Sequence, residues 1–332
     1  MAVPINGPAF ERGATMEDVL RGGAGMGLQG TAVAEAEAVL RRALERRRTQ
    51  GKDKVGIVLA YTSNMVSSGL REVFSYMITE GHVDAIMSTA GGLEEDIIKC
   101  LGHTLVGDFA LPGKALRKDS LNRVGNLLIP NDNYVHFEDF FVPVLRALHI
   151  EQCEASCAAG TTEPSTILQR TGKKLVEAPG VPVLNLEDSV IASCYRAGVP
   201  AFCPAFTDGS MGDMLFFYNI NHKGMIVDPL SDERKLRKLL STFDEVNVIS
   251  VGAGLPKHNV LRAAVKSSAK LASVVLMTTS HETDGCTSSG NRADDESLDQ
   301  LTPETDYARI NTDATLVFPQ LVARVFKDQP QQ

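Results

Sequence analysis

Two stretches in the first third of the chain decide the fold class. The first reads VGIVLA at residues 55–60 and runs into the polar turn YTSN at 61–64. The second reads VDAIM at residues 83–87 and runs into STAGG at 88–92. A short, continuously apolar run that ends in a turn and is followed by a helical segment is typical of a buried parallel strand.

The same alternation continues along the chain. Helices are predicted between the strands, and these patterns together predict an α/β fold: a doubly wound, mostly parallel, Rossmann-like sheet with helices on both faces. Further apolar runs lie at residues 126–129, 199–202, 224–227, 246–251 and 272–277, and the main helices are expected at 32–48 (capped by Thr31), 93–101, 138–149 and 232–240.

No composition shift marks an internal boundary, so the sequence predicts a single domain over residues 1–332. Residues 1–30 are glycine-rich and are expected to be irregular. The tail 328–332 is expected to fray, because chain ends lack neighbours on one side. The acidic stretch 282–306 shows no clear element, and a long loop inside a compact domain is usually functional or mobile.

Composition excludes several classes of function. The chain has 332 residues, of which 43% are hydrophobic, and a net charge of −8. No apolar run approaches the roughly 18 to 20 residues that a membrane span needs, and the charge disfavours nucleic acid as a partner. The six Cys and seven His form no zinc-ligand spacing, so no metal is expected. The expected location is cytoplasmic.

Ligands of an open parallel sheet bind beyond the carboxyl ends of its strands. This rule selects residues 62–69, 89–92 and 252–258. Small, hydroxylated and glycine residues at a helix N-terminus present backbone N–H groups to an anion, which suits a dinucleotide pyrophosphate. The motif is weak on its own, since the GxG at 252–254 lacks the third glycine of the usual fingerprint.

Acidic pairs follow one of these turns and a further glycine-rich loop after the run at 199–202. Glu94 and Glu95 have two readings: carboxylates that favour the first turn of a helix through its dipole, or carboxylates that face a sugar hydroxyl or a cationic substrate. Asp208 and Asp213 lie five residues apart in a glycine-rich segment. Turn formation explains Asp beside Gly but not both acids, and paired carboxylates suit a polyamine.

Six motifs, taken in order, resemble deoxyhypusine synthase: TSN-MVSSG, TAGG-LEED-IIKC, GNLLIPNDNY, PAFTDGSMGDM, GxG-LPKH and DATLVFPQLVA. The likeness extends from about residue 8 to residue 326. It implies a tetramer of Rossmann-like subunits with NAD and spermidine at dimer interfaces. It also implies oxidation of spermidine by NAD, an imine on an enzyme lysine, and transfer of the aminobutyl group to a lysine of a translation factor precursor.

The resemblance carries site residues with it. The NAD contacts of the family map onto Ser63, Asn64, Met65, Val66, Ser67, Thr89, Ala90, Gly91, Glu95, Asp208, Thr279, Ser280, Asp284, Asp313 and Ala314. Its spermidine contacts map onto Glu94, Glu95, Asp213, Ala253 and His258. Carboxylates can pair with ammonium groups, and a histidine can shuttle a proton near neutral pH.

The chain departs from the family where the nucleophile belongs. The family loop has the form DGSDSGxRPDEAVSWGK, and the matching stretch here is DGCTSSGNRADDESLDQL at residues 284–301. The lysine position falls on Leu301 and the tryptophan position on Asp299, and the chain has no Trp at all. No Lys occurs between Ala272 and Phe326. Leucine cannot form an imine, so lysine-based covalent catalysis cannot occur on this loop.

Three hypotheses follow. The first is a catalytically impaired paralogue that acts as a regulatory subunit and pairs with an active homologue in a heterodimer or heterotetramer, with His258 donated to a shared site. The second is a stand-alone NAD-dependent polyamine oxidoreductase that uses His258 as a base without covalent transfer. The third is a binding module that only holds NAD. We expect the first, in which the chain alone is inactive or very weakly active.

Overall fold

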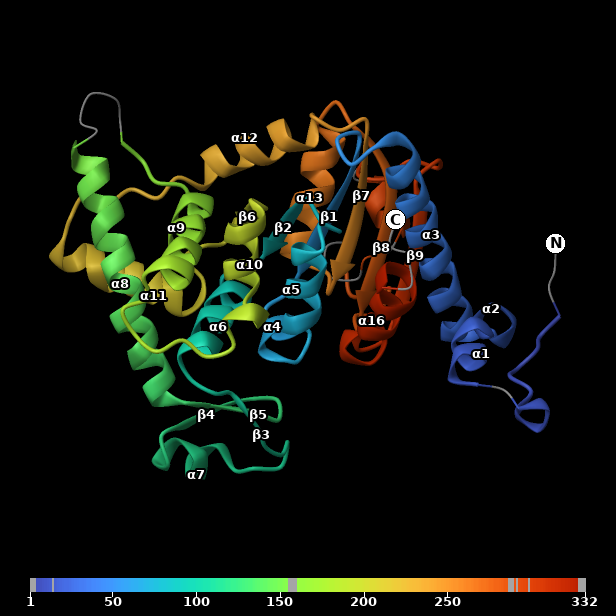
Figure 1. Ribbon diagram of the computed structural model, residues 1–332, viewed down its shortest axis with the longest axis horizontal. Helices are drawn as coiled ribbons and strands as arrows, with labels where there is room; N and C mark the ends of the chain where they lie inside the picture. The colour runs from blue at the N-terminus through green and yellow to red at the C-terminus, as the bar shows by residue number, and fades with distance from the viewer. Residues whose placement is uncertain are drawn as a thin grey trace. The chain divides into compact units, whose positions relative to one another are not determined.

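The computed structural model describes residues 4–13, 15–154, 160–285, 290, 292–297 and 299–327. The chain forms two compact units: one combines residues 1–60 with 237–332, and the other holds residues 61–236. No composition shift in the sequence marks this division, because both units are built from the same strand and helix patterns. Figure 1 shows the elements with their labels.

The unit that contains both chain ends has a parallel sheet. Its strands follow the order β1-β7-β8-β9, and the pairs β7–β8 and β8–β9 are parallel. Its elements are η1 (Phe10–Arg12), α1 (Met16–Arg21), α2 (Gly23–Met26), α3 (Leu28–Gln50), β1 (Val55–Tyr61), β7 (Glu245–Val251), α13 (Leu255–Val265), β8 (Lys270–Thr278), α15 (Arg292–Ser297), β9 (Asp306–Asn311), α16 (Ala314–Val322) and the π-helical η3 (Ala323–Lys327).

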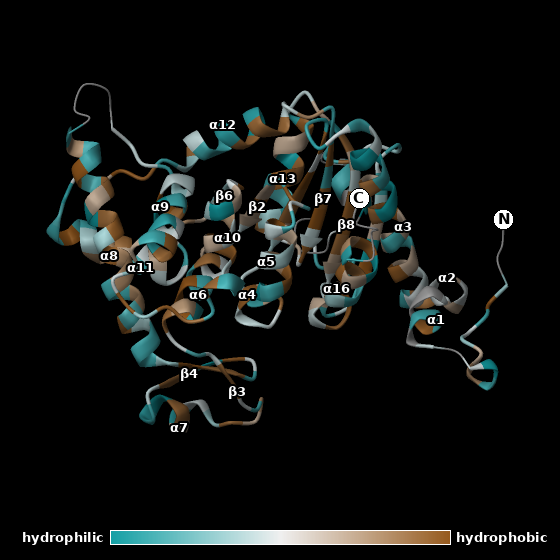
Figure 2. Cartoon of the chain, viewed as in Figure 1, coloured by the Kyte–Doolittle hydropathy of each residue, from teal (hydrophilic) through white to brown (hydrophobic). Residues whose placement is uncertain are grey.

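The core of this unit lies where helices cover the sheet. Strands β7 and β8 are buried along almost their whole length, and Figure 2 shows both in the hydrophobic colour. Helix α3 packs on β8 and β9, and α13 packs on β7 and β8. The buried residues Ala36, Val39, Leu40 and Ala43 recur every three or four positions, so α3 presents one apolar stripe.

The second unit surrounds a short parallel pair, β2–β6, with helices. It also carries a small antiparallel sheet of order β3-β5-β4. Its elements are α4 (Asn64–Ser67), α5 (Arg71–Thr79), β2 (Ala85–Ser88), α6 (Ala90–Leu101), β3 (Leu105–Val106), α7 (Gly113–Lys118), β4 (Leu121–Val124), β5 (Leu127–Pro130), α8 (Asn131–Glu154), α9 (Pro164–Glu177), η2 (Leu186–Asp188), α10 (Val190–Ala197), β6 (Ala201–Phe202), α11 (Gly209–Asn221) and α12 (Pro229–Leu240), the last of which runs across the division.

The predicted mostly parallel α/β fold is confirmed, with local corrections. The run at 126–129 belongs to an antiparallel hairpin instead of a parallel strand. The run at 224–227 makes only an isolated bridge, Thr162 to Val227. Helix α3 begins at Leu28 after Gly27, so Thr31 lies inside the helix and does not cap it. The runs at 126–129 and 224–227 are both apolar, and their sequence pattern alone does not indicate which strand, if any, would pair with them.

Two segments expected to lack elements contain them. Helices α1 and α2 and the start of α3 lie within residues 1–30. Helix α15 and the first residue of β9 lie within 282–306. Strand β9 was not predicted, because its sequence, DYARIN, has no continuous apolar run. It lies at the edge of the sheet, where such a run is not required. The predicted frayed tail, 328–332, falls outside the described residues.

Candidate functional site

Helix α6 follows β2, as the sequence predicts, but it begins at Ala90, earlier than the predicted residue 93. Thr89 precedes the first helical residue, but its side chain caps no backbone N–H. Its hydroxyl instead donates to Oγ of Ser63, at 3.2 Å. The first turn of α6 therefore presents backbone N–H groups that have no side-chain acceptor from the N-cap. Such a terminus is suited to an anion, through both the N–H groups and the helix dipole.

The segment after β1 lies against the same helix terminus. A Cβ added at Gly91 would come within 2.9 Å of Cβ of Ser63, so only glycine fits there. Lys99 donates to the carbonyl oxygens of Val66 (2.7 Å) and Ser68 (3.0 Å) and so ties the α4 turn to α6. The structure thus brings together the predicted cofactor residues 63–67 and 89–91.

Glu94 and Glu95 lie in the second turn of α6, because the helix begins at Ala90 and not at residue 93. The first-turn reading of this acidic pair is therefore wrong. Both side chains are buried, with 6% and 7% of their surface exposed. Two adjacent buried carboxylates are costly unless something compensates their charge.

The two carboxylates differ in their hydrogen bonds. Oε2 of Glu94 accepts the backbone N–H of Met211 at 2.7 Å. Oε2 of Glu95 is buried and has no hydrogen-bond partner among the described residues. Burial, with the charge of Glu94 as the next cause, raises the pKa of Glu95 to about 7. Burial also raises the pKa of Glu94. An ammonium group placed against Glu95 would supply both the missing partner and the missing charge.

Asp208 and Asp213 join this acidic group from helix α11, which packs on α6. Both are exposed, and their charges contribute to the raised pKa of Glu94. Between them Gly209 has a positive φ of 77°, and an added Cβ would lie 2.6 Å from Oε1 of Glu94. The glycine-rich turn is therefore needed for the close approach of the α11 terminus to Glu94. The structure brings together all four acids that the sequence singled out in this unit.

Tyr134 is a residue of this region that sequence reasoning did not single out. It lies at the start of α8, and its hydroxyl is hydrogen-bonded to the Glu95 carboxylate, which lowers the pKa of Glu95 and partly offsets the effect of burial. Burial, together with the charge of Glu95, raises the pKa of Tyr134. The available signal was the motif GNLLIPNDNY, which ends on this tyrosine.

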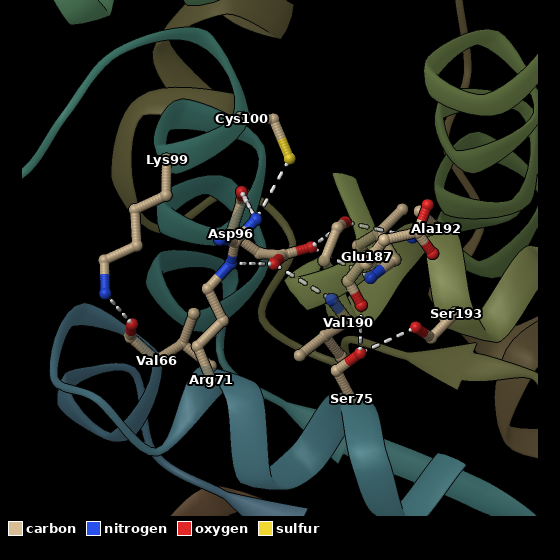
Figure 3. Close-up of polar contacts among 12 residues, drawn as sticks. Val66, Arg71, Ser75, Asp96, Lys99, Cys100, Glu187, Val190, Ala192 and Ser193 are labelled. Atoms are coloured by element: carbon tan, nitrogen blue, oxygen red, sulfur yellow. Dashed lines mark hydrogen bonds and ion pairs between the residues drawn. The ribbon is translucent and has the colours of Figure 1, made fainter. Parts of the chain in front are cut away.

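The neighbouring Asp96 forms a second network that the sequence did not reveal (Figure 3). Its side chain is fully buried and makes an ion pair with Arg71 (2.7 Å). It also accepts the backbone N–H groups of Val190 (3.0 Å) and Ile191 (2.8 Å) and the hydroxyl of Ser189 (2.8 Å). Asp96 therefore fastens the N-terminus of α10 to α6 and holds α6, with its acidic face, in place.

The other predicted site residues lie in the unit that contains both chain ends. Ala253 is in the turn after β7, and His258 is the fourth residue of α13, in its first turn. Nδ1 of His258 lies 3.0 Å from Nε2 of Gln300. Partial burial, followed by the charges of Arg262 and Lys257, lowers the pKa of His258. His258 is thus held by the loop that lacks the family lysine.

That loop is anchored by a buried ion pair. Nζ of Lys257 lies 2.7 and 2.9 Å from the two carboxylate oxygens of Asp295, and both side chains are essentially fully buried. The carbonyl of Asp295 accepts the N–H groups of Gln300 (2.9 Å) and Leu301 (3.3 Å). Leu301, at the family's lysine position, has only 4% of its surface exposed.

The remaining predicted cofactor residues make local contacts. Asp313 caps α16 by accepting the N–H and hydroxyl of Thr315. Asp284 accepts the N–H of His281, and the hydroxyl of Thr278 accepts the N–H of Ser280. Thr279 is exposed, whereas Ala314 is buried. The loop residues 286–289 and 291 lie outside the described residues.

Comparison with known proteins bears on this arrangement. A family model described as deoxyhypusine synthase matches residues 18–325. The chain belongs to the deoxyhypusine synthase family. It is 47% identical over 302 residues to the "Deoxyhypusine synthase regulatory subunit" of Trypanosoma brucei brucei. The aligned region covers 90% of this chain and 85% of that relative. It is 45% identical over 315 residues to the "Inactive deoxyhypusine synthase" of Leishmania donovani, covering 92% and 79%.

The fold of the deoxyhypusine synthase family is also seen in a solved structure. A crystal structure from Entamoeba histolytica, described as a candidate deoxyhypusine synthase, matches with a TM-score of 0.65 and 22% identity over 99% of both chains. Within the described residues, no helix is both long and apolar enough to cross a membrane. The same residues contain no cluster of His, Cys, Asp or Glu that could hold a metal ion.

Proposed function

We propose that this member of the deoxyhypusine synthase family is a regulatory subunit without lysine chemistry of its own, which pairs with an active homologue. One observation carries the proposal: the chain has the acidic group of α6 and α11, with Glu94 and Glu95 buried, but a buried leucine, Leu301, stands where the family has its nucleophilic lysine. The names of the trypanosomatid relatives, one regulatory and one inactive, support it.

The start of α6 and the α4 turn fit the dinucleotide that the family uses. Thr89 leaves backbone N–H groups of the first helical turn without a side-chain acceptor, and Gly91 allows the close approach of Ser63 to this terminus. A pyrophosphate is favoured at such a helix N-terminus. NAD bound there would supply a hydride acceptor for an amine substrate. What this chain's own residues would do is bind the anionic part of the cofactor and hold it in one orientation.

The acidic group fits the polyamine spermidine. Among the described residues, one carboxylate oxygen of Glu95 is buried without a partner. Glu94 adjoins it, and the exposed Asp213 lies near enough for its charge to raise the pKa of Glu94. A polycation is recognised by carboxylates spaced along its length, and the raised pKa of Glu95 would fall when an ammonium group binds. In the mixed complex these residues would serve a site whose lysine and tryptophan come from the partner, and the group transferred would pass to a lysine of the translation factor precursor.

The test is a mixing experiment. The purified chain alone should form almost no deoxyhypusine on the precursor, and adding it to an active homologue should raise the activity well above that of the homologue alone. Substantial activity of the chain by itself, or no effect of adding it, would overturn the proposal. Native mass spectrometry of the mixture should show a heterodimer or heterotetramer.

Asp213→Ala in this chain separates a shared site from a scaffold. The substitution should abolish the gain in activity of the mixed complex if Asp213 contributes to a shared site, and leave it intact if the chain merely supports its partner. Glu80→Ala, which removes an exposed carboxylate outside the acidic group, is the matched control. A stand-alone polyamine oxidoreductase would instead produce NADH from spermidine without a partner.

We propose a cytoplasmic location together with this function.

A further inference from the structure

The short helix α7 and the neighbouring strand β4 carry a cluster of cations that the proposed function does not use. Lys114, Arg117 and Lys118 lie on α7, and Arg123 lies on β4. All four line a hollow of about 550 Å³. Residues 113–123 contain one acid, Asp119, against these four cations, although the chain as a whole has 41 acidic and 33 basic residues.

The cations on α7 lack partners. Positions 114, 117 and 118 are spaced by three and four residues and therefore share one face of the helix, where like charges destabilise it. Within the described ranges, the side chains of these three residues make no ion pair or hydrogen bond. Other exposed arginines of the chain do find a carboxylate, as in Arg48 with Glu45 and Arg196 with Glu187.

Arg123 is held in a defined position at the rim of the hollow. Its Nη1 donates to the carbonyl oxygens of Phe109 (3.1 Å) and Gly125 (2.8 Å). These carbonyl groups orient the guanidinium but leave its positive charge uncompensated. The cationic cluster is therefore partly preorganised, which reduces the entropy that a ligand has to overcome.

The surroundings of the cluster favour an extended polypeptide. Strand β4 is at the edge of the three-stranded sheet, and an exposed edge strand can accept a further strand. Large apolar side chains are exposed on the same small sheet and its connecting loop: Val106 (80%), Phe109 (71%) and Leu105 (49%). Figure 1 shows α7 beside this sheet. Leu105 and Val106 lie on β3, at the other edge of this sheet from β4. Cations beside the edge strand β4, with apolar side chains exposed elsewhere on the same small sheet, match a segment that carries both acidic and apolar residues.

We propose that the α7–β4 surface, defined by Lys114, Arg117, Lys118 and Arg123, binds an acidic, extended segment of a partner protein. Nucleic acid is the less suitable polyanion: the hollow has no aromatic lining residue on which bases could stack, and the chain's net charge of −8 repels a long phosphate backbone. A single phosphate would engage only part of a cluster that extends over a helix face and a strand.

The test uses the full chain and a fluorescein-labelled octapeptide in which Glu and Val alternate. Fluorescence anisotropy should show saturable binding that weakens with added salt. Lys114→Glu/Lys118→Glu should weaken it at least about tenfold. Lys52→Glu/Lys266→Glu, which makes the same charge change at exposed lysines elsewhere, should change it less than about twofold.

Equal losses of affinity in the two double variants would show that peptide binding depends only on the net charge of the chain, and would overturn the proposal. So would equal binding of a peptide with Gln in place of Glu, or tighter binding of a single-stranded RNA octamer. If the charge-reversal variant unfolds, as judged by circular dichroism, Lys114→Ala/Lys118→Ala replaces it with the same expected direction. The proposal is independent of the proposed function, since no readout involves activity.

Discussion

At the scale of single residues, Glu95 is where burial and charge conflict most directly. The residue is 7% exposed, its carboxylate adjoins that of the buried Glu94, and one of its carboxylate oxygens has no partner among the described residues. A structural glutamate at such a position would normally have an ion pair. The conflict is relieved either by a proton or by a bound cation, so the protonation of Glu95 and the binding of an amine are coupled.

Stability should therefore fall as the pH rises through the window set by Glu95. Its pKa is about 7 in the folded chain and near the ordinary 4.5 when unfolded, so the folded state holds more protons between these values. The free energy of unfolding should decrease across this window by roughly 3 kcal/mol at most. Glu95→Gln should remove most of that decrease in urea titrations at several pH values. Glu80→Gln, at an exposed site, should keep it; an unchanged pH profile in Glu95→Gln would contradict the prediction.

The contact between Gln300 and His258 should determine which ring nitrogen of neutral His258 carries the proton. With the amide N–H of Gln300 donating to Nδ1, the neutral ring carries its proton on Nε2 and is a donor there, not a base. Two-bond ¹H–¹⁵N NMR should show that tautomer for His258 in the wild type and a mixture in Gln300→Leu. Gln300→Glu should raise the pKa of His258, because a carboxylate favours the charged ring. A ring protonated on Nδ1 in the wild type would refute the assignment.

At the scale of elements, the acidic site depends on how α6 is held. Asp96 on α6 supplies the acceptor for two N–H groups at the start of α10 and pairs with the buried Arg71 on α5. Removing one partner from a buried ion pair leaves the other uncompensated, which costs more than the pair contributes. The network therefore stabilises three helices through a single carboxylate.

Asp96→Ala should destabilise the chain strongly. We expect a loss of about 3–5 kcal/mol in the free energy of unfolding, because Arg71 is left as an unpaired buried cation. Asp96→Asn keeps hydrogen-bonding capacity and should cost less. Asp119→Ala, on the surface, should be close to neutral. Urea unfolding followed by circular dichroism measures all three; a loss under about 1 kcal/mol for Asp96→Ala would show that the network is not structural.

The loop after β8 makes a related prediction. Leu301 is buried, and its backbone N–H donates to the carbonyl of Asp295, which pairs with the buried Lys257, so a lysine at position 301 would have its charged group in a buried position. Leu301→Lys should therefore form no spermidine-derived imine. Borohydride reduction after incubation with NAD and spermidine, followed by mass spectrometry, should show no adduct on Lys at this position, while an active homologue treated in parallel should show one.

At the scale of the whole molecule, the predicted site residues divide between two compact units. Residues 63–67, 89–91, 94, 95, 208 and 213 belong to one, and residues 253, 258, 279, 280, 284, 301, 313 and 314 to the other. Each group is built on a recognisable scaffold, α6 with α11 in one case and β7 with α13 in the other. Loss of the lysine affects only the second group.

NAD should consequently stabilise the assembled complex more than the lone chain. A ligand that binds the folded, assembled form raises its melting temperature in proportion to the logarithm of concentration once it is in excess. We expect a larger rise for the mixture with an active homologue than for either chain alone, measured by scanning fluorimetry over a range of NAD concentrations. Gly91→Ala in this chain should reduce the rise, because an added Cβ would collide with Ser63. Equal shifts in the lone chain and the mixture would contradict a link to assembly.

Much of this could be predicted from local pattern. Continuous apolar runs identified β1, β7 and β8, because a strand covered on both faces must be apolar along its length. The edge strand β9 and the helices before residue 30 could not be found this way, since neither needs such a run. The order of motifs identified the family, and the absence of lysine from residues 272–326 removed its covalent chemistry.

The sequence by itself determined which chemical groups the chain has: the acids at 94, 95, 208 and 213, and leucine in place of lysine at 301. Only the tertiary structure decided what those groups experience. Burial of α6 raises the pKa of Glu95, Tyr134 reaches it from α8, and Asp96 is committed to Arg71 and α10 although it directly follows Glu95 in the sequence. The physical reason is that solvation and hydrogen-bond partners come from segments far apart in the chain, which no local pattern records.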